Sequence, residues 1–182
     1  MIEDLVIRAK DSEPEAFSEL YELFVEKIYR FLLFKVGSVT EAEDLTAWVF
    51  EKAWENLKKY KKGNFQAWLF KIARNTLIDF WRKEKKEKSL EEIGEIGSHT
   101  DILADLCKKD EQKQLLLAFK KLKNKYYEVL SLRFLNDLSV TETAKIINKS
   151  EGAVGVIQHR ALKSLRMIME EKNIELKEFM II

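Results

Sequence analysis

Apolar residues recur three and four positions apart along most of the chain, which is the spacing of amphipathic helices. The first strong run extends from Phe17 to Leu32 and is followed by Gly37, a residue type that commonly ends helices. Ser12 and Glu15 have the spacing of a capping box, so we expect the helix to begin at this pair. The pattern therefore predicts one long amphipathic helix in the first segment of the chain.

Two further runs of the same period follow. Thr40 and Glu43 are spaced as a second capping box, and the apolar stripe behind them reaches Leu57. A third helix is expected after the break at Gly63-Asn64. Its predicted buried stripe comprises Phe65, Trp68, Leu69, Ile72, Ala73, Leu77 and Phe80. Its opposite side carries Lys71, Arg74, Asn75, Arg82 and Lys83. We predict that these helices form a bundle over residues 1–88.

The pattern changes in the middle of the chain. Residues 89–111 lose the helical period and contain two of the six glycines, so we expect a linker there. A second module, residues 112–182, has two further apolar runs, and Ser139 with Glu142 is spaced to cap a short helix. A single proline and few glycines leave little material for hairpins. The sequence thus predicts an all-α protein with two small helical domains and a flexible linker.

The second module ends in the pattern of a helix-turn-helix. Asn148-Lys149 interrupts the apolar period, and Ser150 is a suitable N-cap for a final long helix. In this motif the second helix enters the major groove and its first residues meet base edges. Gly152 and Gly155 lie in its first turns, where each costs about 0.5–1 kcal/mol relative to Ala. Because small residues allow the backbone to approach DNA closely, we predict that this helix binds duplex DNA.

Composition narrows the class of protein. The 46% apolar and 35% charged content fits folded helical modules, and the single cysteine, Cys107, excludes an internal disulfide. Two distant histidines, with no phosphate loop and no clustered carboxylate motif, predict no catalytic site, no metal and no cofactor. The absence of a signal peptide and of a membrane-length apolar run favours a cytoplasmic protein without membrane insertion.

The net charge of +1 conceals four blocks of alternating sign. Residues 1–57 carry −7, residues 58–88 carry +8, residues 89–111 carry −5 and residues 112–182 carry +5. Two basic blocks indicate two surfaces for a polyanion, and the acidic first block suits a basic protein partner. The alternative is a stand-alone helix-turn-helix regulator whose N-terminal bundle senses a signal or dimerises, although such a bundle has no need of the second basic block.

Two blocks of this sequence resemble a known family. Residues 42–83 read AEDLTAWVFEKAWENLKKYKKGNFQAWLFKIARNTLIDFWRK and resemble region 2 of the extracytoplasmic-function (ECF) class of bacterial sigma factors. Residues 122–166 read LKNKYYEVLSLRFLNDLSVTETAKIINKSEGAVGVIQHRALKSLR and are similar to region 4 of that class. The resemblance implies a dissociable initiation subunit of RNA polymerase. Region 2 would bind the clamp of the core enzyme and the non-template strand of the −10 element. Region 4 would bind the −35 duplex and the flap, and an anti-sigma factor is a further partner of many relatives.

The resemblance and the chemistry of the side chains together assign three sets of residues. The expected −10 set is Asn64, Lys71, Arg74, Asn75, Trp81 and Arg82. The expected −35 set is Ser150, Gly152, Gly155, Val156, His159, Arg160 and Lys163. The expected core polymerase set is Glu43, Asp44, Leu45, Trp48 and Glu51. Asn75 can hydrogen-bond a base, the cations can pair with phosphates, and Trp81 is the stacking candidate. Trp68 and Phe80 are expected in the core, and Asp79 is expected to orient a neighbouring arginine.

The chain departs from the family pattern in two places. Ala47-Trp48 stands where the family often has Gln-Glu, which replaces a polar contact with a large aromatic side chain. In the predicted recognition helix, residues 155–158 read GVIQ where the family commonly has Lys-Ser-Arg-Leu, so basic contacts are lost. The −35 preference of relatives therefore does not transfer to this chain.

Overall fold

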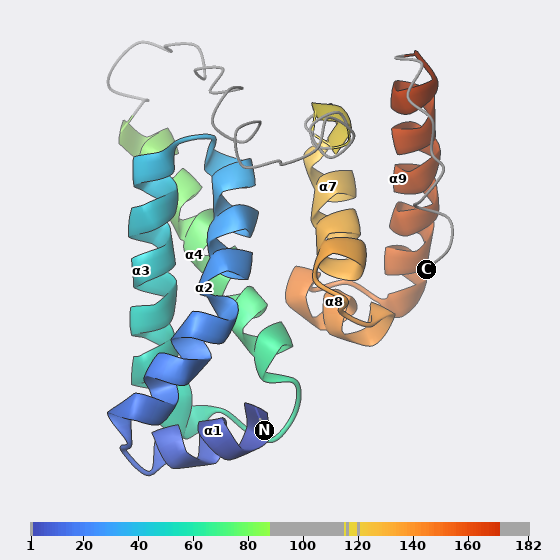
Figure 1. The fold of residues 1–182 in the computed structure, drawn as a ribbon. Helices are drawn as coiled ribbons and strands as arrows, with labels where there is room; N and C mark the ends of the chain where they lie inside the picture. The colour runs from blue at the N-terminus through green and yellow to red at the C-terminus, as the bar shows by residue number, and fades with distance from the viewer. Residues whose placement is uncertain (1, 88–114, 116, 120, 172–182) are drawn as a thin grey trace. The chain divides into compact units, whose positions relative to one another are not determined.

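The computed structural model describes residues 2–87, 115, 117–119 and 121–171 (Figure 1). The chain divides into two compact units, Met1–Ser98 (unit 1) and His99–Ile182 (unit 2). Every regular element in the described parts is helical, and no strand occurs among them. The prediction of an all-α protein with two helical domains is confirmed. The predicted linker, residues 89–111, lies outside the described residues.

Unit 1 is built around three helices that pack side by side, α2 (Pro14–Val36), α3 (Val39–Asn56) and α4 (Phe65–Glu87) (Figure 1). Their apolar stripes meet in a core whose fully buried members include Leu20, Ile28, Phe31, Leu69 and Phe70. A short 3-10 helix, η1 (Leu57–Lys59), and a turn connect α3 to α4. Because the apolar stripe of α4 is buried, the opposite side of this helix faces solvent. That side carries most of the residues of the expected −10 set.

The first helix, α1 (Ile2–Lys10), was not predicted, and it corrects the proposed capping box at Ser12. Ser12 has φ 70° and ends α1 in the left-handed conformation. Its N–H donates to the Ala9 carbonyl at 3.2 Å, and the Glu13 N–H donates to the Arg8 carbonyl at 3.2 Å. These two bonds form a Schellman motif. Helix α2 begins instead directly after its N-cap residue Glu13, whose side chain makes no capping hydrogen bond.

The predicted capping box of Thr40 and Glu43 is also wrong. Helix α3 begins two residues earlier, at Val39, because Ser38 is the N-cap and its Oγ accepts from the Glu41 N–H at 3.4 Å. Gly37, at φ 74°, turns the chain directly into this start. A Ser/Thr-x-x-Glu spacing occurs at both positions, and the short turn selects the earlier one.

Unit 2 contains α7 (Asn124–Leu130), a π-helical segment η2 (Ser131–Leu135), α8 (Val140–Ile147) and α9 (Glu151–Glu171). Its core includes Leu132, Leu138, Val154 and Ala161. After Leu130 the helical turn widens into the π-helix. The buried Asn136 side chain donates to the Ser131 carbonyl at 3.0 Å and satisfies a carbonyl in the widened turn.

The predicted start signals of the helix-turn-helix are confirmed. Ser139 and Glu142 form a complete capping box at the start of α8. Asn148 ends α8 in the left-handed conformation at φ 53°. The Ser150 Oγ accepts from the Ala153 N–H at 3.2 Å and caps α9. Helices α8 and α9 are thus joined by a three-residue turn in the arrangement that the sequence indicated.

Candidate nucleic-acid interface

The outer side of α4 presents polar and cationic side chains on one stripe. Lys71, Asn75 and Arg82 are exposed and stand at relative positions i, i+4 and i+11, so they share a face. Arg74, at the edge of this stripe, is half-buried. Leu69, which lies on the opposite face, is fully buried. The arrangement presents hydrogen-bond donors and positive charge on one exposed surface while the other side of the helix anchors it.

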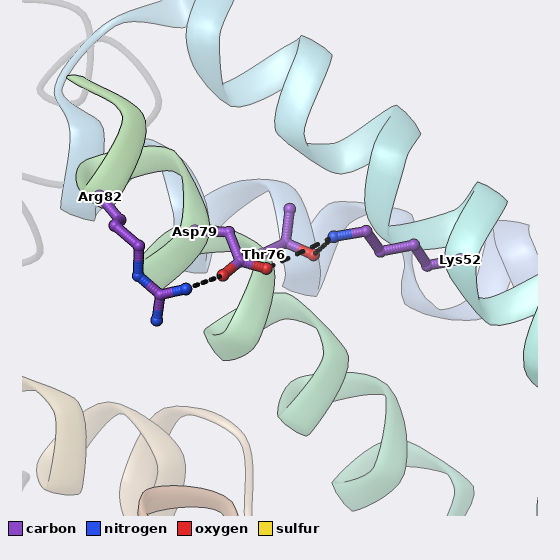
Figure 2. Close-up of polar contacts among 4 residues, drawn as sticks. All are labelled: Lys52, Thr76, Asp79 and Arg82. Carbon is purple, nitrogen blue, oxygen red and sulfur yellow. Dashed lines mark hydrogen bonds and ion pairs between the residues drawn. The ribbon is translucent and has the colours of Figure 1, made fainter. Parts of the chain in front are cut away.

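A network between α3 and α4 flanks this stripe (Figure 2). The Asp79 carboxylate lies 3.5 Å from the Arg82 Nη1 and 4.0 Å from the Lys52 Nζ. The Lys52 ammonium also donates to the Thr76 Oγ1 at 3.3 Å. The expectation that Asp79 orients a neighbouring arginine is confirmed. The sequence did not predict a role for Lys52, because its partners lie on a different helix and cannot be inferred from the spacing of residues within α3.

An aromatic cluster lies at the beginning of α4. The Trp68 ring is half-buried and packs on Tyr60 at 5.1 Å and on Phe65 at 5.4 Å between centroids. Trp68 is therefore part of the packing, as predicted. Trp81, the stacking candidate, is half-buried. Asn64 has a structural task, since its Oδ1 accepts from the Ala67 N–H at 3.2 Å and caps α4.

The first turns of α9 form a second exposed surface, in unit 2. All seven residues of the expected −35 set are exposed: Ser150, Gly152, Gly155, Val156, His159, Arg160 and Lys163. Half of the Val156 side chain is accessible. The helix is held from behind by Val154, Ala161, Leu165 and Met169, which are buried. A cationic and partly apolar strip is thus displayed along one side of the helix.

The two glycines of α9 have no packing reason within the described parts of the chain. Apart from the chain neighbours and the surrounding backbone of α9 itself, a Cβ at Gly152 or Gly155 would meet no atom of the described residues within 4 Å. Neither glycine has a positive φ. Neither a neighbouring side chain nor the backbone conformation therefore requires a small residue at these two positions.

The departure at residues 155–158 has a structural consequence on the inner side of α9. Gln158 is half-buried, and its Oε1 accepts from the Arg133 Nε at 3.1 Å. Arg133 also donates to the Leu138 carbonyl. The Gln158 side chain, on the inner side of α9, thus has a hydrogen-bond partner in Arg133 of η2. Ile157 beside it is half-buried.

Helix α3 carries an acidic outer face. Glu43, Asp44 and Glu51 are exposed, and Trp48 has 46% of its surface accessible. Leu45 is the exception in the expected core polymerase set, because it is 1% exposed and belongs to the interior of unit 1. It stands one turn from the buried Ala42 and Val49, so it faces inward and offers no surface to a partner.

The described ranges contain no group of three or more histidine, cysteine or carboxylate side chains that could hold a metal. Within the same ranges, no helix combines the length and apolar character needed to cross a bilayer.

Comparisons with known proteins give these surfaces a context. The family models for sigma-70 region 2 and sigma-70 region 4 match residues 20–87 and 118–167. Two helical units of these kinds, in this order, define an RNA polymerase sigma factor. The chain is 33% identical over 177 residues to the ECF RNA polymerase sigma factor BldN of Streptomyces coelicolor, covering 92% of this chain and 66% of BldN. It is 31% identical over 178 residues to the ECF RNA polymerase sigma factor SigW of Bacillus subtilis, covering 91% of this chain and 95% of SigW.

The chain belongs to the extracytoplasmic-function class of RNA polymerase sigma factors. Its fold also resembles that of CnrH in the complex with the cytosolic domain of CnrY, with a TM-score of 0.67 at 22% identity over 92% of this chain and 96% of CnrH. As an alternative sigma factor, it directs RNA polymerase to specific promoters. The stand-alone regulator is ruled out as the alternative, because the bundle that was to serve as its sensor matches sigma region 2.

Proposed function

We propose that the two exposed surfaces divide promoter recognition between the units. The outer stripe of α4 captures the non-template strand of the −10 element, and the first turns of α9 read the −35 element as duplex. The observation that supports this division is that each unit displays a donor-rich helix face opposite a buried apolar stripe. Bases that have left the duplex need hydrogen bonds and stacking, whereas a duplex accepts a helix in its major groove.

Within the −10 surface, side chains take different tasks. The Asn75 amide is suited to hydrogen-bond a base edge, while Lys71, Arg74 and Arg82 are suited to phosphates. Arg82 is oriented by Asp79, which reduces the side-chain entropy that strand binding costs. Trp81 is the stacking candidate, and Asn64 contributes by fixing the start of α4.

Within the −35 surface, Gly152 and Gly155 permit close approach, His159 and Arg160 donate to bases or phosphates, and Lys163 pairs with a phosphate. Ser150 caps the helix by accepting from the Ala153 N–H, which fixes where α9 begins. The exposed Val156 offers an apolar contact to a thymine methyl group.

The acidic outer face of α3 is proposed to bind the clamp of core RNA polymerase, with Trp48 as its apolar centre and Glu43, Asp44 and Glu51 around it. Unit 2 would contact the flap. The chemistry of RNA synthesis stays with the polymerase, so this chain needs no catalytic residue of its own and works in the cytoplasm. An anti-sigma factor is a further proposed partner, by analogy with the sigma factor RpoE of Bartonella quintana, which is known in complex with the anti-sigma factor NepR.

The division of labour can be tested in the assembled holoenzyme on a promoter whose start site has been mapped. The double variant Lys71→Ala/Asn75→Ala should reduce the permanganate reactivity of opened −10 thymines by about tenfold or more, because a single lost hydrogen bond to a charged group is worth roughly 1.5–3 kcal/mol. The variant His159→Ala/Arg160→Ala should weaken binding to the −35 duplex instead. Lys27→Ala, an exposed lysine on α2, is the matched control. Opening at the parent rate by the α4 variant would contradict the assignment.

A further inference from the structure

Helix α1 holds the turn that leads into the proposed strand-binding helix. The Lys10 ammonium donates to the Tyr60 carbonyl, across fifty residues of sequence, and lies 5.4 Å from the centroid of the same tyrosine ring. Helix α1 also packs against η1 and α4. A single lysine therefore contacts both the backbone and the side chain of the residue at which the turn begins.

Tyr60 also contacts the other end of the turn. Its hydroxyl donates to the Gly63 carbonyl at 2.7 Å, so the residues between them are closed into a loop. Burial raises the pKa of the Tyr60 phenol above its ordinary value, and the carboxylate of Glu3 raises it further. The hydroxyl consequently stays protonated at neutral pH and keeps donating this hydrogen bond.

The ring of Tyr60 joins the turn to α4. It is 9% exposed, packs edge-on against Phe65 at 5.7 Å and packs at a tilt against Trp68 at 5.1 Å between ring centroids. The turn itself carries the exposed Lys61 and Lys62 and ends at Asn64, the N-cap of α4. The placement of these cations relative to the stripe of Lys71 and Asn75 depends on the shape of the turn.

We propose that Lys10 is a positioning residue for capture of the −10 single strand. By fixing Tyr60, it keeps the turn at residues 60–64 in the shape that places its lysines beside α4 before DNA arrives. A turn without this restraint would have to be ordered on binding, and affinity would fall by that ordering cost. The inference rests on the proposed function of α4 and assigns a role to a helix outside the −10 set.

The test compares three variants in the holoenzyme. Lys10→Met removes the ammonium but keeps an unbranched chain, and Lys10→Arg keeps a cation and its donors. Lys27→Met is the matched control, because Lys27 is exposed and lies over the Phe24 ring at 5.9 Å, on α2. The probe is a fluorescent single-stranded oligonucleotide with the non-template −10 sequence of a mapped promoter, measured well below every unfolding midpoint.

We expect Lys10→Met to bind the strand about five- to tenfold more weakly, while Lys10→Arg recovers most of the affinity and Lys27→Met matches the parent. Binding to core polymerase and to the −35 duplex should be unchanged. The slope of log affinity against log salt should also be unchanged, because a positioning residue neutralises no phosphate. Loss of a direct phosphate contact would reduce the slope by about 0.7.

Three results would overturn the inference. Parent-like strand affinity of Lys10→Met would show that the turn needs no restraint from α1, and a reduced salt slope would make Lys10 a direct contact. Equal losses in strand, polymerase and −35 binding would indicate a general structural defect. If the parent holoenzyme itself fails to bind the strand, the proposed function of α4 fails as well, so the two failures are distinguishable.

Discussion

At the scale of single residues, Gly155 is a helical glycine that no side-chain contact within the described parts of the chain requires. A mid-helix glycine is unfavourable, yet a Cβ here would meet no atom of the described residues within 4 Å. Ordinary packing arguments therefore predict that a larger residue would be tolerated or even stabilising. Close approach of DNA predicts that the same change damages binding, so stability and function should respond in opposite directions.

The series Gly155→Ala, Gly155→Leu and Gly155→Arg separates these effects. Ala should stabilise α9 by about 0.5–1 kcal/mol, and Leu should leave the fold at least as stable as the parent. Leu should bind the −35 duplex worst, whereas Arg can reach a phosphate or a guanine edge. Melting temperature and duplex affinity at one fixed salt concentration are the two measurements. A Leu variant that binds as tightly as the parent would reduce the glycine to a tolerated weak turn.

At the scale of elements, α3 shows how one helix serves two environments. Leu45 is buried in unit 1, whereas Trp48, three residues later, has 46% of its surface exposed. The inner side therefore determines stability, and the acidic outer side is available to a partner. Trp54 offers a matched comparison, since it is 43% exposed but packs edge-on against Phe17 of α2 at 4.8 Å.

Substitutions on the two sides of α3 should give opposite phenotypes. Leu45→Ala should cost about 2–5 kcal/mol in the free energy of unfolding, because it opens a cavity in the core. Trp48→Ala should change that free energy by less than about 0.5 kcal/mol while weakening binding to core polymerase. Trp54→Ala is the control for loss of an exposed indole. Chemical unfolding and a fluorescence binding assay with core enzyme measure both effects, and undiminished polymerase binding by Trp48→Ala would refute the assigned contact.

The elements also show what the sequence can and cannot reveal. The helical period located α2, α3, α4 and α9 and the exposed side of α4, because periodicity depends only on the residues of one helix. The start of α3 was misplaced, since two Ser/Thr-x-x-Glu pairs compete and only the turn at Gly37 decides between them. Lys52, Lys10 and the pairing of Arg133 with Gln158 could not be predicted, because each depends on how separate elements pack.

At the scale of the whole molecule, three of the four charge blocks correspond to surfaces of the described helices. The acidic first block includes the outer face of α3, and the strongly basic second block includes the two lysines of η1, the turn at residues 60–64 and the stripe on α4. Unit 2 carries its own basic surface on α9. A sigma factor contacts both RNA polymerase and promoter DNA, and separate surfaces of opposite charge allow these contacts without competition.

Run-off transcription tests the central claim most directly. Core RNA polymerase is incubated with genomic fragments, with and without the full chain, and the 5′ ends of the transcripts are mapped. The account predicts start sites that appear only with the chain and lie downstream of a shared pair of −10 and −35 sequences. The Lys71→Ala/Asn75→Ala variant should lose these transcripts while still binding core polymerase. Transcripts that do not depend on the chain, or start sites without a shared upstream pair, would contradict the account.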